Sequence, residues 1–218
     1  LEISGSISSQ FISALLLIGP MLEKGLELKM TNTIISRPYI DLTLCMMRDF
    51  GAAVEWTDVD TISVAPKPYT SRRYYIESDW SAGSYWYEIM ALSDDSEATV
   101  RLEGLMDGSR QGDSVVKYIF SLLGVKTSFE TTDPCVPNTV TLRRHKCLLP
   151  RLEYDFTGSP DLAQTLVVCC ALMDIKFHFK GLATLRIKET DRIEALKTEL
   201  RKLGYVLHNV GDNELFWD

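Results

Sequence analysis

The stretch Leu203–Leu207, with the sequence Leu-Gly-Tyr-Val-Leu, decides the fold because its arrangement occurs twice more along the chain. Phe50–Val54 (Phe-Gly-Ala-Ala-Val) and Leu123–Thr127 (Leu-Gly-Val-Lys-Thr) also place a glycine between an apolar helical pattern and a strand-forming run. A glycine in this place is typical of the position just after a helix, where the backbone turns left-handed. The three stretches therefore predict three helices that each lead into a strand.

Equal spacing upstream of these glycines indicates an internal repeat. The positions 43 residues before them are Ser8, Ser81 and Asp161, and each of these follows a small-residue turn and opens an apolar helical run. A shared offset at both ends of three segments is hard to obtain by chance. The sequence therefore predicts three copies of one structural unit, with periods of 73 and 80 residues.

Hydropathy patterns within each copy predict the order βαβαββ. The expected first strands are Leu1–Ile3, Tyr74–Glu77 and Leu152–Phe156, and the expected apolar helices are Phe11–Ile18, Tyr85–Leu92 and Leu162–Met173. The expected middle strands are Leu26–Met30, Thr99–Glu103 and Lys176–Lys180, followed by an amphipathic helix and two closing strands. Because the apolar helices have almost no polar face, we expect them to lie buried among sheets in an α/β fold.

The composition excludes several classes of protein. The chain of 218 residues is 45% hydrophobic and 24% charged, the usual balance of a soluble globular protein. Its net charge of -7 argues against broad nucleic-acid binding, although a few clustered cations can still hold an anion. No apolar run approaches the length of a bilayer span, and five cysteines without a CxxC pair favour a reduced, cytoplasmic protein away from the membrane.

Polar residues at the start of the first apolar helix form one candidate site. Gly5–Gln10 has the sequence Gly-Ser-Ile-Ser-Ser-Gln, which places the hydroxyls of Ser8 and Ser9 at a helix N-terminus. Free backbone N–H groups and the helix dipole favour an anion there. The alternative is that one of these serines only caps the helix.

A charged run at the start of the last helix forms the second candidate site. Lys188 and Arg192 are four residues apart and share a helical face, with Glu189 between them. Two cations and a carboxylate at a sheet edge suit an anionic substrate and a proton carrier, whereas the alternative is a solvated, salt-bridged helix start. Asp161 is similarly either a first-turn helix acid or a general base.

Five motifs occur in the order found in the EPSP synthase (3-phosphoshikimate 1-carboxyvinyltransferase) family, which the chain resembles over nearly its whole length. They are Gly5–Phe11, Ser36–Asp41, Arg110–Asp113, Pro160–Asp161 and Lys188–Arg192. The resemblance implies the enolpyruvyl transferase fold, an inside-out α/β barrel of six βαβαββ units in two domains, of which this chain holds three. Residues 1–77 would be the last unit of one domain, and residues 78–218 would be two units of the other.

The resemblance also implies an activity. The family transfers the enolpyruvyl group of phosphoenolpyruvate to the 5-hydroxyl of shikimate 3-phosphate and releases phosphate, in the shikimate pathway to chorismate and aromatic amino acids. The reaction is an addition followed by an elimination, and it requires no metal or organic cofactor. We therefore expect a cytoplasmic monomer whose partners are these two small molecules.

The same motifs imply which residues bind the shikimate substrate. Ser8, Ser9 and Ser36 would hold its phosphate, and Lys188 would also bind this substrate. Gln10 would contact both substrates, since its motif lies at their shared site in the family.

The remaining motifs imply the chemical roles. Asp161 would orient the shikimate ring and take the proton from the attacking hydroxyl, and Glu189 would handle the proton at the methylene carbon. Arg192 would pair with the carboxylate of phosphoenolpyruvate through its planar fork. Thr184 departs from the family, which often has Asn or His there as a shikimate ligand.

Two alternatives remain beside this interpretation. A UDP-N-acetylglucosamine enolpyruvyl transferase shares the fold, but its reactive cysteine loop is not apparent in this sequence. A non-catalytic repeat module is the alternative from a different class. Because several phosphoenolpyruvate-binding segments of the family have no counterpart here, we expect an internal fragment that is inactive alone.

Overall fold

Each of the three repeat glycines follows a helix in the left-handed conformation, as the sequence predicts. In a computed structural model, which describes residues 1–134, 136–147 and 149–218, the φ angles of Gly51, Gly124 and Gly204 are 85°, 92° and 97°. L-residues with a Cβ atom rarely adopt such angles, whereas glycine does so readily. The three predicted helix ends are therefore confirmed, and each lies before the two closing strands of its repeat.

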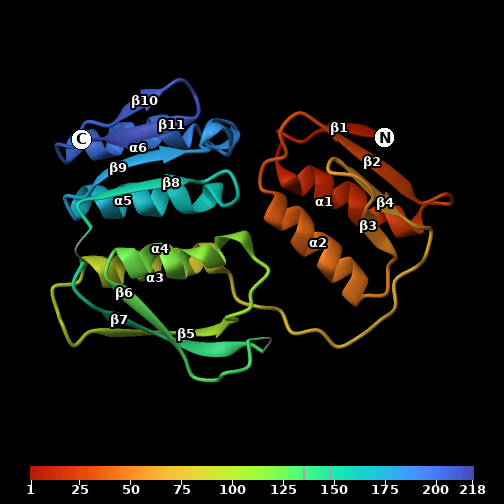
Figure 1. The fold of residues 1–218 in the computed structure, drawn as a ribbon, viewed down its shortest axis with the longest axis horizontal. Coiled ribbons are helices and arrows are strands. Elements are labelled where there is room, and N and C mark those ends of the chain that lie inside the picture. Colours follow the sequence, from red (N-terminus) through yellow and green to blue (C-terminus); the bar gives the residue numbers. More distant parts are fainter. Residues whose placement is uncertain (135, 148) are drawn as a thin grey trace. The chain divides into compact units, whose positions relative to one another are not determined.

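The chain forms two compact units, each with its own hydrophobic core (Figure 1). The N-terminal unit comprises Leu1–Tyr74 with Arg110–Gly112, and the C-terminal unit comprises Tyr75–Ser109 with Asp113–Asp218. The N-terminal unit holds the first repeat, and the C-terminal unit holds the second and third.

The first repeat follows the predicted order. Its elements are β1 (Glu2–Ser4), α1 (Ser9–Ile18), the short η1 (Gly19–Met21), β2 (Leu26–Thr31), α2 (Arg37–Asp49), β3 (Val54–Trp56) and β4 (Thr61–Val64). The sheet order is β1-β2-β4-β3, in which β1 and β2 are parallel and the other neighbours are antiparallel. One face of α1, with Ile12 and Leu16, and one face of α2, with Ile40 and Leu44, are buried in the core.

The third repeat has the same topology. Its elements are β8 (Arg151–Asp155), η3 (Pro160–Leu162), α5 (Ala163–Leu172), β9 (Lys176–Lys180), η4 (Ala183–Ile187), α6 (Arg192–Lys202), β10 (His208–Val210) and β11 (Glu214–Trp217). The sheet order is β10-β11-β9-β8, and β8 runs parallel to β9 with Leu152 opposite Phe177. In the first and in the third repeat, the two parallel strands therefore end at the same edge of their sheet.

The second repeat lacks the predicted first strand. It consists of α3 (Trp80–Leu92), β5 (Thr99–Leu105), η2 (Gly112–Val115), α4 (Val116–Leu122), β6 (Val125–Phe129) and β7 (Asn138–Arg144), with the antiparallel sheet order β5-β7-β6. The strand expected at Tyr74–Glu77 is wrong, because this segment forms no ladder in the described part of the chain, although the next residue, Ser78, donates its N–H to Gly104 O at 2.8 Å. The segment crosses from one compact unit to the other, so its path is not set by β5 alone.

Apolar helices lie between the two sheets of the C-terminal unit (Figure 1). α3 contacts β5, β7 and α5, and α5 contacts β9. Most of α5 is fully buried, including Cys169 and Cys170, and this burial raises the pKa of both thiols. Where the two helices meet, the hydroxyls of Ser84 and Thr165 lie 2.9 Å apart and satisfy each other. The predicted buried helix is confirmed for α5.

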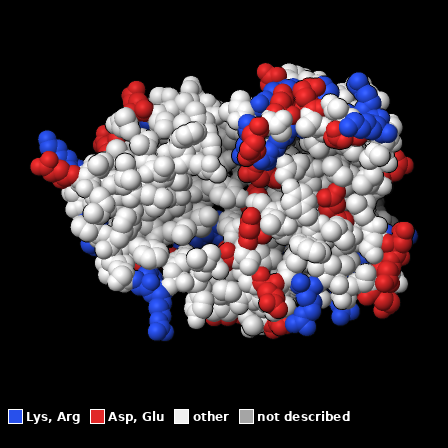
Figure 2. Space-filling view, turned by 180° about the vertical axis from the view of Figure 1, so that it is seen from behind, with Lys and Arg blue, Asp and Glu red and all other residues white. Residues whose placement is uncertain are grey.

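The surface of the C-terminal unit mixes both signs of charge. Figure 2 shows Lys and Arg side chains beside Asp and Glu side chains over this unit, rather than one continuous acidic face. Binding of an anion therefore depends on local groups rather than on the net charge. Within the described ranges, every helix is too short or too polar to cross a bilayer.

Candidate active site

In the N-terminal unit, two helices begin at the edge where the parallel strands end. β1 leads to Ser8 at the start of α1, and β2 leads to Ser36 at the start of α2. The two loops are joined through Gly5, whose N–H donates to Thr31 O at 2.7 Å and whose carbonyl accepts from Ile35 N–H at 3.0 Å. This edge is the place where α/β sheets bind ligands.

The serines at this edge have different local roles. Ser8 caps α1, since its Oγ accepts a hydrogen bond from Gln10 N–H at 3.4 Å. Ser36 precedes α2 with a φ of 56°, in the left-handed region, and Pro38 occupies the first turn of that helix. Three side-chain groups have no hydrogen-bond partner in the described part of the chain and are available to a ligand. They are the hydroxyls of Ser9 and Ser36 and the side-chain amide of Gln10. The cap role of Ser8 leaves its free lone pair available as well.

In the C-terminal unit, the edge after β8 and β9 brings the charged candidates together. Asp161 lies in η3, while Lys188 and Arg192 flank the start of α6. Lys188 Nζ is 3.2 Å from Asp161 Oδ1, and Arg192 Nη1 is 2.9 Å from the same oxygen. One carboxylate therefore lies between two cations, 27 and 31 residues away along the chain. The alternative of a helix start paired only within itself does not describe this arrangement.

Arg192 is held by three side chains. Its Nη2 donates to Glu189 Oε2 at 2.7 Å, and its Nη1 donates to Asp161 Oδ1 and, at 3.1 Å, to Gln164 Oε1. The hydrogen bond from Arg192 lowers the pKa of the Glu189 carboxyl. Burial alone would lower the pKa of the Arg192 guanidinium, but the bond to Glu189 and the charge of Asp161 raise it above its usual value. Both groups are therefore charged at neutral pH.

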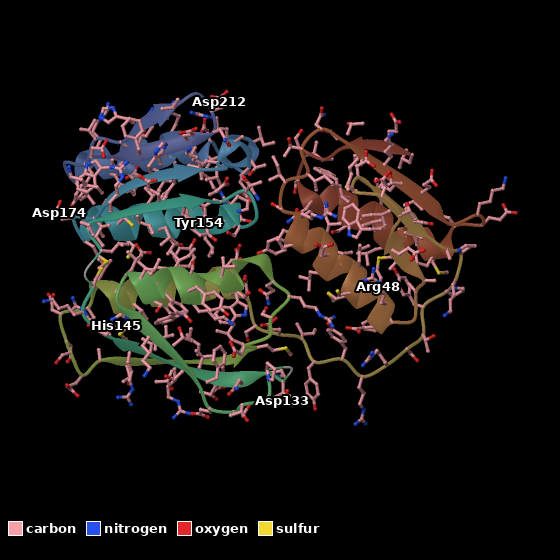
Figure 3. All side chains as sticks on the ribbon, in the orientation of Figure 1. Arg48, Asp133, His145, Tyr154, Asp174 and Asp212 are labelled. Carbon is pink, nitrogen blue, oxygen red and sulfur yellow. The ribbon has the colours of Figure 1, made fainter. Side chains whose placement is uncertain are left out.

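A second arginine fixes the backbone that carries these residues. Arg186 pairs with Asp191 at 3.0 Å and with Asp212 at 3.1 Å. Asp191 is also the N-cap of α6, and its carboxylate accepts from Glu194 N–H at 3.1 Å. Asp212, labelled in Figure 3, lies in the turn between β10 and β11. Arg186, before Lys188 in the sequence, thereby joins Asp191, after it, to the turn between β10 and β11.

Gln164 and Tyr85 belong to this hydrogen-bonded cluster and were not predicted from the sequence. Gln164 contacts Arg192, and its Nε2 donates to the Tyr85 hydroxyl at 2.8 Å. Gln164 lies one helical turn after Asp161, which is the one signal that could have indicated it.

Thr184 is 6% exposed, and its Oγ1 has no hydrogen-bond partner among the described residues.

The family model of EPSP synthase (3-phosphoshikimate 1-carboxyvinyltransferase) matches residues 1–213. The chain belongs to the EPSP synthase family. The 3-phosphoshikimate 1-carboxyvinyltransferase of Bacteroides fragilis is 51% identical over 218 residues, which is 100% of this chain and 51% of that protein. The enzyme of the same name from Idiomarina loihiensis is 35% identical over 205 residues, covering 93% of this chain and 46% of its own length.

Two solved structures share the fold of this chain. EPSP synthase from Acinetobacter baumannii superposes with a TM-score of 0.71 at 20% identity, over 100% of this chain and 48% of that one. The enolpyruvyl transferase NikO from Streptomyces tendae gives a TM-score of 0.57 at 18% identity, over 93% and 44%. The predicted enolpyruvyl transferase fold is therefore confirmed. The chain spans about half the length of the curated relatives it matches.

Proposed function

We propose that this chain is an internal part of an enzyme that transfers the enolpyruvyl group of phosphoenolpyruvate to the 5-hydroxyl of shikimate 3-phosphate. The observation that carries the proposal is the Asp161 carboxylate between Lys188 and Arg192, at a sheet edge of a chain in the EPSP synthase family. A base flanked by two cations suits a reaction between two anions, because the cations hold the substrates while the base removes a proton.

The addition step assigns Asp161 the role of general base. The shikimate 5-hydroxyl oxygen attacks C2 of phosphoenolpyruvate as Asp161 takes the hydroxyl proton, and Glu189 supplies a proton to the methylene carbon, C3. Lys188 and Arg192 hold the Asp161 carboxylate in place, and each would also contact one substrate. Elimination then returns a proton from the new methyl group to Glu189 and expels phosphate, which takes the proton held by Asp161, and the C2–C3 double bond is restored.

Glu189 suits this role because solvent reaches it. Arg192 donates to Glu189 and lowers the pKa of its carboxyl. The Glu189 side chain is 77% exposed, so solvent can supply the proton that it passes to C3.

The edge of the N-terminal unit supplies the phosphate site in this proposal. Ser9 and Ser36 offer hydroxyls at two helix N-termini, while Ser8 caps α1 and Gln10 lies in the first turn of that helix. A phosphate group is stabilised there by hydroxyl donors, free N–H groups and helix dipoles. Gln10 would also contact phosphoenolpyruvate.

The proposal includes the organisation of the longer protein. Residues 1–77 form the last repeat of one domain, and residues 78–218 form two repeats of the other. The coverage of about half of each relative supports this division, and the chain alone would lack part of the site. The complete enzyme would be a cytoplasmic monomer.

Phosphate release by the complete protein tests the proposal. We expect release only when phosphoenolpyruvate and shikimate 3-phosphate are both present, and none from residues 1–218 alone. Release that depends on UDP-N-acetylglucosamine instead would establish the other enolpyruvyl transferase, and no release with either acceptor would favour a non-catalytic module. Asp161→Ala should abolish the activity.

A further inference from the structure

We propose that Tyr85 and Gln164 are positioning residues that orient the Arg192 guanidinium for an anionic substrate. The proposal rests on the proposed function, in which Arg192 binds the phosphoenolpyruvate carboxylate. Neither Tyr85 nor Gln164 needs to touch substrate for this role.

The three side chains form one continuous hydrogen-bonded chain. The Tyr85 hydroxyl accepts from Gln164 Nε2 at 2.8 Å, and Gln164 Oε1 accepts from Arg192 Nη1 at 3.1 Å. Each end of the amide has a partner of the matching kind, so the amide has one orientation that satisfies both. Reversing it would place an NH2 group against the guanidinium, where neither could accept.

The contact defines which donors of Arg192 remain for a ligand. A guanidinium has five N–H groups. Nη1 uses both of its own on Asp161 and Gln164, and Nη2 uses one on Glu189. The Nε–H and one Nη2–H have no partner in the described part of the chain. Two donors in a rigid plane are what a carboxylate needs for a bidentate pair.

An amide suits this position better than a third carboxylate. The charges of Lys188 and Arg192 already equal those of Asp161 and Glu189, so the cluster is neutral. Gln164 restrains Nη1 without adding negative charge, whereas a glutamate would repel an incoming anion.

Tyr85 links the site to a different repeat. It lies on α3 of the second repeat, 79 residues before Gln164 on α5 of the third. α3 and α5 pack together in the interior of the C-terminal unit, and Ser84 beside Tyr85 contacts Thr165 beside Gln164. The orientation of Arg192 therefore depends on the packing of two repeats.

Steady-state kinetics of the complete enzyme test the proposal. Gln164→Met should raise the KM for phosphoenolpyruvate by about tenfold and Tyr85→Phe by about threefold, because a hydrogen bond to a charged group is lost or loosened. The KM for shikimate 3-phosphate should stay within about twofold in both variants. Since Tyr85 acts through Gln164, Tyr85→Phe should have no further effect in the Gln164→Met background.

Tyr118→Phe is the matched control, because it removes the same hydroxyl from an exposed tyrosine on α4 of the same unit. It should leave both KM values unchanged. Equal increases in both KM values, or independent effects of Tyr85 and Gln164, would overturn the proposal.

A second measurement does not need activity. Modification of Arg192 by phenylglyoxal, followed by mass spectrometry, reports how firmly the guanidinium is held. We expect Gln164→Met to speed the modification severalfold and Tyr118→Phe to leave it unchanged, and equal rates in wild type and Gln164→Met would refute the positioning role. If wild type modifies slowly but transfers no enolpyruvyl group, the proposed function fails while the positioning stands.

Discussion

At the scale of single residues, Asp161 concentrates the chemistry of the site, because one of its oxygens faces both Lys188 and Arg192. Asp161→Asn keeps the size of the side chain and one acceptor oxygen but removes the base. We expect kcat of the complete enzyme to fall by about 10²- to 10⁴-fold, the usual contribution of a general base. Glu153→Gln, in an exposed pair with Arg151, is the control and should keep full activity. A threefold loss or less for Asp161→Asn would remove it from the mechanism.

Glu88 gives the C-terminal unit a pH-dependent stability. Burial raises the pKa of its carboxyl from 4.5 to about 7. Between these two values the folded chain keeps a proton that the unfolded chain has lost, so stability falls as the pH rises through this window.

Glu88→Gln should remove this dependence. Because the side chain is partly exposed, we expect a stabilisation of about 1 kcal/mol at pH 8 and none at pH 4. Urea unfolding followed through the fluorescence of Trp80 and Trp86, both on α3, measures the difference. An equal effect at the two pH values would show that burial of the charge is not the cause.

Sequence spacing predicted the residues of the charged cluster that lie in recognisable motifs, and it did not predict the others. Lys188 and Arg192 share a helical face by their spacing, and the structure brings both to Asp161. The contacts of Gln164 and Tyr85 depend on how α3 packs against α5, and sequence spacing carries no information on that. Long-range side-chain geometry is therefore the part of the site that requires a structure.

At the scale of elements, the repeat glycines were predictable because a left-handed helix end requires a particular residue. The missing strand before α3 was not predictable. Tyr74–Glu77 has strand-forming residues, yet Glu77 instead accepts from Trp80 Nε1 at 2.7 Å and from Met106 N–H at 2.9 Å. Side-chain anchoring at a crossing between two compact units overrides local β propensity here.

Substitution of two of these glycines by alanine distinguishes the cost of a positive φ angle from the cost of a steric clash. A Cβ at Gly204 would meet no atom within 4 Å, whereas a Cβ at Gly124 would lie 2.6 Å from His145 O. Gly204→Ala should therefore cost about 1 kcal/mol from the positive φ alone. Gly124→Ala should lower the free energy of unfolding by more, since the backbone where β6 begins must also move. Denaturant midpoints of the two variants give the comparison, and equal costs would contradict it.

At the scale of the whole molecule, the apolar helices are covered to different extents, and α3 of the C-terminal unit leaves Ile89 54% exposed. α5 is enclosed in the C-terminal unit, but α1 leaves Phe11 64% and Ile18 52% exposed. These side chains line an apolar groove with Ile3, Ile7 and Leu15 on the N-terminal unit. Periodicity could predict that α1 is apolar all round, but not which of its faces this chain covers.

Limited proteolysis of residues 1–218 should reveal this difference. Arg72 and Arg73 lie between β4 and α3, in a stretch without helix or strand, so trypsin should cut there first. The C-terminal piece keeps two repeats around one core and should persist, whereas the N-terminal piece has a single repeat with an open apolar face and should be degraded.

Mass spectrometry identifies the surviving piece, and its cooperative thermal unfolding would show that it is folded. A variant with Arg72 and Arg73 replaced by glutamine is the control, because its first cut should be slower and should lie elsewhere. Survival of the N-terminal piece beyond the C-terminal one would mean that coverage of the apolar helices does not set the stability of these units.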